Sequence, residues 1–374
     1  MFDFPIKEFN EWAAIYLLSV YSIIYLSFNK YLFKSKNVEI KRYIPNTKII
    51  LCIVFFIVTH CMHGDFFHMM ERVHHEFSFV RNAYNVGEPI YVDIARLVDR
   101  NYFLFRIVVW GGAFWIFIRT VIRLNIQPTI AALILFTIYV SLFAYARVTL
   151  AMAVYFYGLS FLCVTYKHKI ISYLIGVIII LLASSFHTSA FIMIAATPVI
   201  FIPHKKWIYI LTILLIPVLI ILLKTVFSSM LSLESLDETV VHKMNSYTER
   251  DTSRGIAALL IDIFNYATIY VPYLIIFQTF VKKNYWLKLT KDMIVYFKVS
   301  SGLILLATAF FFAGEMFFTF FYRVLFMAMI PTTLLIAKLY QSDIISKKQI
   351  KLFLLVGLVY HFLRYAYNLY LSLI

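Results

Sequence analysis

The feature that most constrains this chain is a series of apolar stretches, each about 17 to 25 residues long, that recur from one end to the other. A helix of that length crosses about 30 Å of hydrocarbon, whereas a soluble domain interrupts its apolar residues at helical or strand spacing. Hydrophobic residues make up 62% of the 374 residues and charged residues only 14%, against about 25% in a soluble domain. The sequence therefore predicts an all-α, polytopic integral membrane protein.

The apolar stretches predict about 12 transmembrane helices in a single transmembrane domain, residues 1–374. Their expected positions are 12–28, 49–62, 102–122, 129–146, 148–166, 170–185, 189–203, 207–226, 255–281, 293–312, 316–337 and 352–373. Alternate loops carry most of the lysines, and the positive-inside rule places those loops in the cytoplasm. Both termini and the two long hydrophilic loops, 63–101 and 227–254, are then expected outside.

The charge and cysteine patterns exclude several functions. The net charge of +15 resides largely in short loops between spans, which argues against nucleic-acid binding. The three cysteines show no CxxC spacing, so neither a disulfide framework nor a zinc site is indicated. Five histidines lie within sixteen residues, 60–75, but they match no HExxH pattern. We expect no metal and no cofactor.

Two arginines lie within apolar stretches on the expected outer side. Arg147, in AYARVTLAM, is the only charged residue between Pro128 and Tyr166, and Arg323 lies about two helical turns into a span. An arginine at the centre of a membrane helix costs about 2.5 to 3.5 kcal/mol on insertion scales. Either side chain could extend to the membrane surface, or its planar guanidinium could bind a phosphate with two hydrogen bonds.

Three further residues are candidates for proton transfer or for contacts to sugar hydroxyls. His187, in SSFHTSAF, lies at an outer turn, where a histidine either caps a helix or acts as a base. Asp65 directly follows an apolar span, and Glu88 precedes Pro89. His361 and Arg364 share a face of the last helix, but the flanking tyrosines favour an aromatic belt at the membrane surface.

Six motifs follow one another in the chain: GDFFHMMERV, GEPIYVDIARLV, WIFIRTVIR, ARVTLAMAVYFYGLSF, SSFHTSAFIMI and YRVLFMAMIP. Their order resembles the EpsG-like branch of the Wzy-type polysaccharide polymerases, which make O-antigen, capsule or exopolysaccharide. The resemblance covers about residues 60 to 335, and FHTSA and the ARxxxA spacing are its more specific parts. The chain departs from the usual pattern at Phe66, Phe67, Ile90, Val148 and Thr149.

The resemblance implies a GT-C-like membrane architecture and glycosyl transfer outside the cytoplasm. The growing glycan would leave its undecaprenyl pyrophosphate carrier and join the non-reducing end of an incoming lipid-linked repeat unit. Arg147 and Arg323 would bind the pyrophosphate, since stabilising this anionic leaving group is the largest catalytic task. The candidates for the catalytic base are His187, Asp65 and Glu88. Further substrate contacts are expected from Tyr322, Arg72 and Arg81.

The same resemblance implies the bacterial cytoplasmic (inner) membrane, with the active site facing the periplasm or exterior. Expected partners are undecaprenyl-pyrophosphate-linked oligosaccharides and the lipid bilayer, with a chain-length regulator and a flippase as candidate protein partners and no nucleic acid.

Three other functions are compatible with parts of the sequence. A flippase or exporter of the same lipid could use the arginines, but its two halves would show repeated hydropathy, whereas the loops 63–101 and 227–254 differ from each other. A membrane acyltransferase would need a histidine deep in the membrane and a cytosolic acyl donor, whereas His187 lies at the expected outer face. A glycan ligase is chemically the closest alternative, and the sequence barely separates it from a polymerase.

Overall fold

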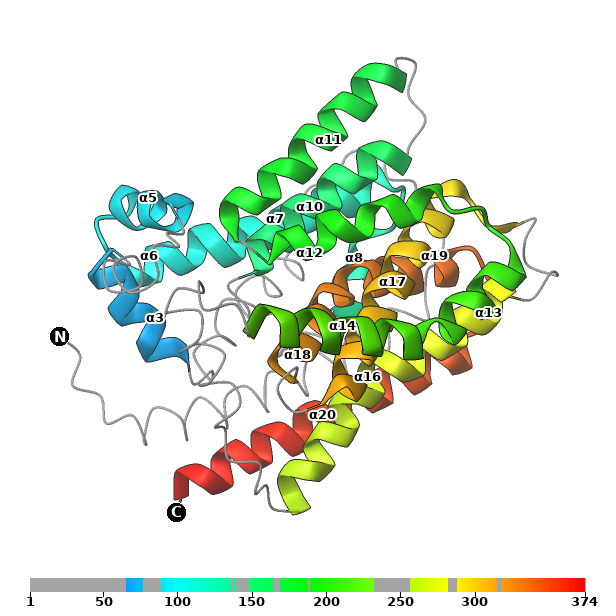
Figure 1. Ribbon diagram of the computed structural model, residues 1–374. Coiled ribbons are helices and arrows are strands. Elements are labelled where there is room, and N and C mark those ends of the chain that lie inside the picture. The colour runs from blue at the N-terminus through cyan, green and yellow to red at the C-terminus, as the bar shows by residue number, and fades with distance from the viewer. Residues whose placement is uncertain are drawn as a thin grey trace.

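The computed structural model describes residues 65–76, 89–135, 138, 148–163, 169–187, 189–231, 256–281, 288–314 and 318–373 (Figure 1). Within these ranges the regular structure is entirely helical, with no strand, so the all-α class is confirmed. Helices are expected here because a membrane-spanning backbone must satisfy its hydrogen bonds within the segment.

The first half of the described chain holds two short helices, α3 (Asp65–His74) and α5 (Pro89–Leu97), inside the segment that was expected to be a loop. The helices that follow are α6 (Tyr102–Arg106), the π-helix η2 (Ile107–Gly111), α7 (Gly112–Arg123), α8 (Pro128–Ile134), α10 (Thr149–Cys163) and α11 (Lys169–Phe186).

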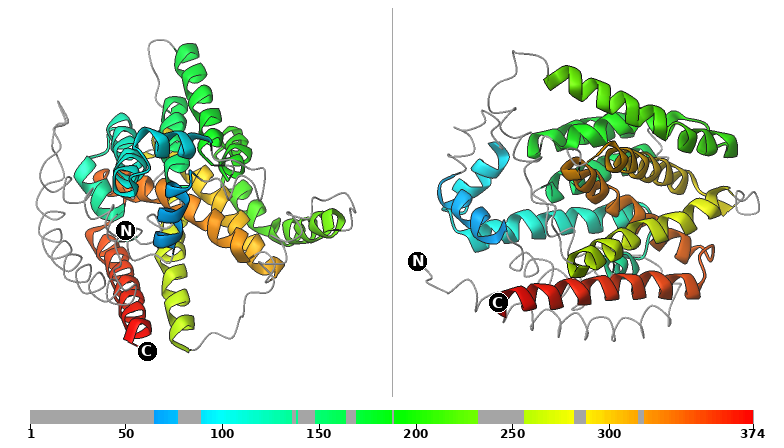
Figure 2. Two further views of the ribbon diagram at one scale, coloured as in Figure 1. Left: turned by 90° about the vertical axis from the view of Figure 1, so that its left-hand side faces the viewer. Right: turned by 60° about the horizontal axis from the view of Figure 1, so that its bottom comes forward.

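The second half contains α12 (Ala190–Ala196), the 3-10 helix η4 (Thr197–Phe201), α13 (Lys206–Leu214), α14 (Ile216–Leu231), α16 (Ile256–Val281), α17 (Lys291–Ala313), α18 (Phe318–Met327), α19 (Met329–Gln341) and α20 (Lys347–Leu373). Figure 2 shows α20 running alongside α16, with which it is in contact.

Five of the described helical segments are long and apolar enough to cross a membrane: Tyr102–Arg123, Lys169–Phe186, Ile263–Val281, Lys291–Ala313 and Phe321–Gln341. A sixth is present if α13 and α14, which meet at a 41° bend, form one broken span. These helices make the chain a membrane protein, while the total of about 12 spans and the GT-C-like architecture stay predictions.

α10 is the central helix of the bundle, and it packs against α7, α11, α12, α17 and α19. Its residues are apolar and buried on nearly every side, which is the pattern of a helix enclosed by other helices. It meets α11 at Gly158 and Gly176, where a Cβ added to either glycine would lie 2.9 to 3.0 Å from the carbonyl oxygen of the other. The crossing therefore depends on the absence of a side chain at both positions.

Ends of α7, α10, α11, α17 and α19 meet at one end of the bundle, called here the lysine-rich end because Lys169, Lys291 and Lys338 lie there. Lys291 at the start of α17 donates hydrogen bonds to the carbonyl of Leu162 (3.2 Å) and the hydroxyl of Tyr173 (3.0 Å), on α10 and α11. Lys338 on α19 donates to the carbonyl of Leu124 after α7 (2.6 Å) and lies 3.5 Å from Asp292. The opposite helix ends, together with α3 and α5, form the other end of the bundle, called here the α3–α5 end (left in Figure 1).

Candidate functional site

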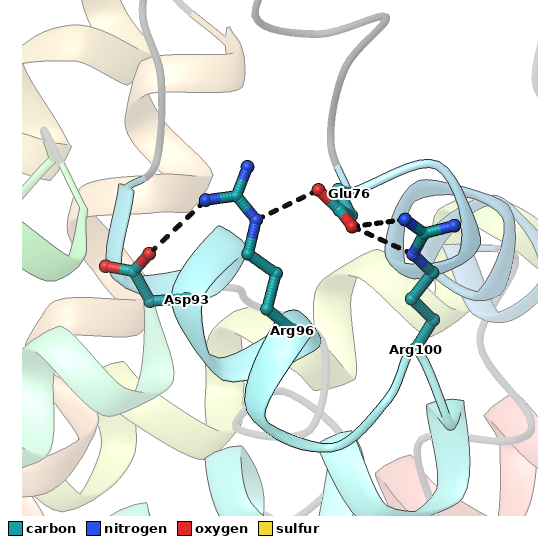
Figure 3. Close-up of polar contacts among 4 residues, drawn as sticks. All are labelled: Glu76, Asp93, Arg96 and Arg100. Carbon is teal, nitrogen blue, oxygen red and sulfur yellow. Dashed lines mark hydrogen bonds and ion pairs between the residues drawn. The ribbon is translucent and has the colours of Figure 1, made fainter.

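At the α3–α5 end, a carboxylate shared between two arginines links α3 to α5 (Figure 3). α3 and α5 contact each other and α6, and α5 also packs on α11. Glu76, just after α3, accepts hydrogen bonds from Nε of Arg96 (3.0 Å) and Nε of Arg100 (2.8 Å). Arg96 also lies 3.9 Å from Asp93, one turn earlier on α5. These ion pairs fix α5 over the start of the first described span.

The two arginines also determine the charge of Glu76. The hydrogen bond from Arg96, followed by that from Arg100, lowers the pKa of the Glu76 carboxyl below its ordinary value. Glu76 is therefore ionised at neutral pH, and its hydrogen bonds connect α3 to α5. A carboxylate whose pKa is lowered in this way is a weak base, so Glu76 is a poor candidate for the catalytic base.

His187 lies in the turn between α11 and α12, where its ring takes part in the backbone structure. The Nδ1 atom of His187 accepts a hydrogen bond from the backbone N–H of Ser189 (3.0 Å). Because Nδ1 uses its lone pair as an acceptor, the neutral ring carries its proton on Nε2. In this arrangement His187 closes the turn that leads into α12, and its neutral ring is a hydrogen-bond donor rather than a base at Nε2.

Tyr322 and Arg323 lie on α18, the first helix after α17. Arg323 is half-buried and stands five residues after the start of α18, roughly 8 Å along the helix axis. The hydroxyl of Tyr322 lies 3.2 Å from that of Tyr266 on α16. The ring of Tyr322 also packs beside Phe326 at 6.3 Å between centroids. This places Arg323 within the helical bundle near its α3–α5 end.

The other predicted site residues divide into two groups. Asp65 is the first residue of α3, and Arg72 lies half-buried near its end, so both belong to the α3–α5 end. The rest lie outside the described residues: Glu88, Arg81 and Arg147. The structure thus brings α3, the His187 turn and α18 to one end, and the convergence of Arg147 with His187 and Arg323 stays a prediction.

Comparison with known proteins agrees with the motif order. The model of the EpsG family matches residues 64–374, which is most of the chain. The chain belongs to the EpsG family. No match is found among curated proteins or among solved structures. The resemblance drawn from the motifs is confirmed, and family membership points to a polysaccharide polymerase-like role in the membrane.

A buried arginine of this EpsG-family protein was not among the residues predicted from the sequence. Arg106 at the end of α6 is only 2% exposed, with its guanidinium 5.8 Å from the ring of Tyr102. The π-helix η2 follows it directly, and such bulges are frequent at functional sites. The signal was present in the sequence, because Arg106 is the only charged residue between Arg100 and Arg119.

A buried lysine, also missed, has a structural role. Lys298 on α17 donates hydrogen bonds to the carbonyls of Ile200 (3.0 Å) and Ile202 at the end of η4. These carbonyls have no partner within their own short helix, so the ammonium group acts as a C-terminal cap.

The aromatic belt expected around His361 does not include Tyr360, while the side chains of Tyr365, Tyr367 and Tyr370 lie outside the described part of the structure. Tyr360 and His361 are fully buried, and the ring of His361 interacts with the backbone of Ile138. Arg364 donates a hydrogen bond to the Tyr360 hydroxyl (3.3 Å). The burial of these two residues could not be read from the sequence, because helical spacing shows which residues share a face but not which face is covered by other helices.

Within the described residues, no group of three or more histidines, cysteines or acidic residues could hold a metal ion. His60 and His63 of the histidine-rich segment lie outside them. The expectation of a site without metal therefore stays a prediction.

Proposed function

We propose that this EpsG-family protein is a membrane glycosyltransferase that polymerises undecaprenyl-pyrophosphate-linked oligosaccharide repeat units at its α3–α5 end. The observation that carries the proposal is the half-buried Arg323 at that end of an EpsG-family membrane bundle. A guanidinium inside a membrane protein is expected to face an anionic partner or a cavity, and a lipid-linked pyrophosphate supplies such an anion.

In the proposed reaction, a hydroxyl oxygen at the non-reducing end of the acceptor unit attacks the anomeric carbon of the growing glycan. The new C–O bond forms as the bond from that carbon to the pyrophosphate breaks, and undecaprenyl pyrophosphate leaves with the electron pair. Arg323 and Arg147 would stabilise the negative charge that develops on this leaving group.

The hydroxyl proton goes to a base, for which Asp65, Glu88 and His187 are the candidates. The hydrogen bond between Ser189 and Nδ1 of His187 favours the two carboxylates, because Nε2 of a neutral His187 already carries a proton. We propose that His187 instead donates a hydrogen bond to the substrate. The positive charge of the arginines would stabilise the leaving group without a divalent metal.

The test is product analysis with the purified protein in liposomes, supplied with the lipid-linked repeat unit and a chelator. The wild type should give a ladder of lipid-linked oligomers. Arg323→Ala should slow ladder formation by about 10²- to 10³-fold, the usual cost of removing one donor to a developing charge. Arg119→Ala is the matched control, because Arg119 is exposed on α7 toward the lysine-rich end.

Two other outcomes would overturn the polymerase. Movement of the lipid-linked unit between leaflets without any ladder would identify a flippase. Transfer of the glycan to a different acceptor lipid, again without a ladder, would identify a ligase.

A further inference from the structure

The α3–α5 end contains a buried amide that none of the roles above explains. Asn265 on α16 is 4% exposed, and within the described residues nothing donates a hydrogen bond to its side-chain oxygen, Oδ1. Buried polar atoms without a partner are rare in folded proteins, and each calls for an explanation such as a ligand.

The position of Asn265 along α16 places it toward the α3–α5 end of the bundle, the same end as Arg323. α16 and α17 run antiparallel: Phe280 stacks on Phe297 toward the lysine-rich end, and Tyr266 packs against Phe311 at the other end. Asn265 is two residues after Ile263, the first residue of the candidate membrane span Ile263–Val281. It therefore lies near the α3–α5 boundary of the membrane span.

The neighbour of Asn265 in the chain connects it to α18. The hydroxyl of Tyr266 lies 3.2 Å from that of Tyr322, whose next residue is Arg323. The ring of Tyr266 also packs on Phe321 at 5.3 Å between centroids. Asn265 thus adjoins Tyr266 on α16, Arg323 adjoins Tyr322 on α18, and the two helices meet where Tyr266 contacts Phe321 and Tyr322.

The chemistry of Oδ1 limits the class of ligand that can bind to it. A carbonyl oxygen accepts hydrogen bonds, so its partner must be an O–H or N–H donor, whereas an ionised pyrophosphate offers only acceptors. Sugar hydroxyls are such donors, and aromatic side chains supply apolar surface beside a polar group.

We propose that Asn265, Tyr266 and Tyr322 form a saccharide-binding subsite in which Oδ1 of Asn265 accepts a hydrogen bond from a glycan hydroxyl. This subsite rests on the proposed function, in which Arg323 binds the pyrophosphate of the same lipid-linked substrate. Asn265 thus contacts the sugar part of the substrate, while Arg323 binds its pyrophosphate.

Asn265→Leu tests the subsite, because leucine nearly matches asparagine in shape but cannot accept a hydrogen bond. Thr268→Val is the matched control: Thr268 is buried on the same helix, and its hydroxyl already donates to the backbone carbonyl of Asn265 (2.6 Å). The probes are undecaprenyl pyrophosphate alone and the same lipid bearing the repeat unit, with binding to the full-length protein measured by native mass spectrometry.

Asn265→Leu should weaken binding of the glycan-bearing lipid about tenfold, as expected for one lost hydrogen bond, and leave binding of the bare lipid unchanged. Thr268→Val should leave both unchanged. The melting temperature of Asn265→Leu should stay level or rise, because an acceptor without a partner has been removed.

If Asn265→Leu weakened binding of both lipids equally, or of neither, the subsite would be overturned. An equal loss of binding together with a lower melting temperature would show that Asn265 has a structural role. Arg323→Ala distinguishes pyrophosphate binding from glycan binding, since it should weaken binding of both the bare lipid and the glycan-bearing lipid. Wild-type protein that binds neither lipid would overturn the proposed function and the subsite together.

Discussion

The crossing of α10 and α11 gives the sharpest prediction about stability. A Cβ added at Gly158 would lie 2.9 Å from the carbonyl oxygen of Gly176 and 2.9 Å from the backbone nitrogen of Ile180. These are backbone atoms, so no side chain can rotate to make room, and the two helices must separate. Overpacking of this kind costs about 1 to 3 kcal/mol. We therefore expect Gly158→Ala to lower the free energy of unfolding by that amount.

The effect should be large for the whole protein because much of α11 depends on this contact. One face of α11 packs on α10, while other faces carry exposed apolar side chains, among them Ile170, Leu174 and Ile178. Separation of the helices at the glycine pair would also remove contacts along the crossing.

Gly302→Ala on α17 is the matched control. The nearest atom to a Cβ at Gly302 is 3.9 Å away, which is ordinary contact, and alanine favours a helix over glycine by about 1 kcal/mol. The assay is reversible unfolding of the purified protein in mixed detergent micelles. Gly158→Ala should be destabilised, and Gly302→Ala should be neutral or stabilised. Equal stability of the two variants would refute the close crossing.

Three other predictions concern the polar groups of the described residues. The pKa of Glu76 is lower in the folded protein than in the unfolded chain, so its ion pairs stabilise α5 at any pH above the ordinary carboxyl pKa. This stabilisation is lost as the pH falls through the folded pKa, and the rate of amide hydrogen exchange in α5 should then rise. Glu76→Gln should remove this pH dependence. Lys298→Met should lower the unfolding free energy by about 1 to 3 kcal/mol, because it leaves two carbonyls without a donor, while the exposed Lys288→Met should be neutral in the same detergent unfolding assay. His187→Ala should lower the melting temperature, whereas His187→Asn should leave it unchanged, because an asparagine oxygen can also accept the Ser189 N–H. Equal falls in melting temperature for the two variants would argue against a role of this hydrogen bond in the turn.

The sequence indicated several candidate site residues, but it did not indicate the contacts that these residues make. The order of the motifs identified the family, and it pointed to His187 and Arg323 as candidate site residues. The role of His187 in closing its turn depends on the backbone geometry there, which the residue type alone leaves open. Arg106 and Asn265 were missed because reasoning from motifs weighs recognised patterns above an isolated polar residue in an apolar helix.

The sequence by itself determined the all-helical membrane class and the grouping of the lysine-rich helix ends. Both follow from local rules, because an apolar segment in lipid must satisfy its own backbone and lysines stay at the membrane surface. Only the tertiary structure decided which side chains are enclosed. It buried Tyr360 and His361, where the sequence favoured tyrosines at the membrane surface. It also paired Glu76 with Arg96 and Arg100, which are 20 and 24 residues away. Helical spacing fixes which residues share a face, whereas the packing of neighbouring helices fixes what that face touches.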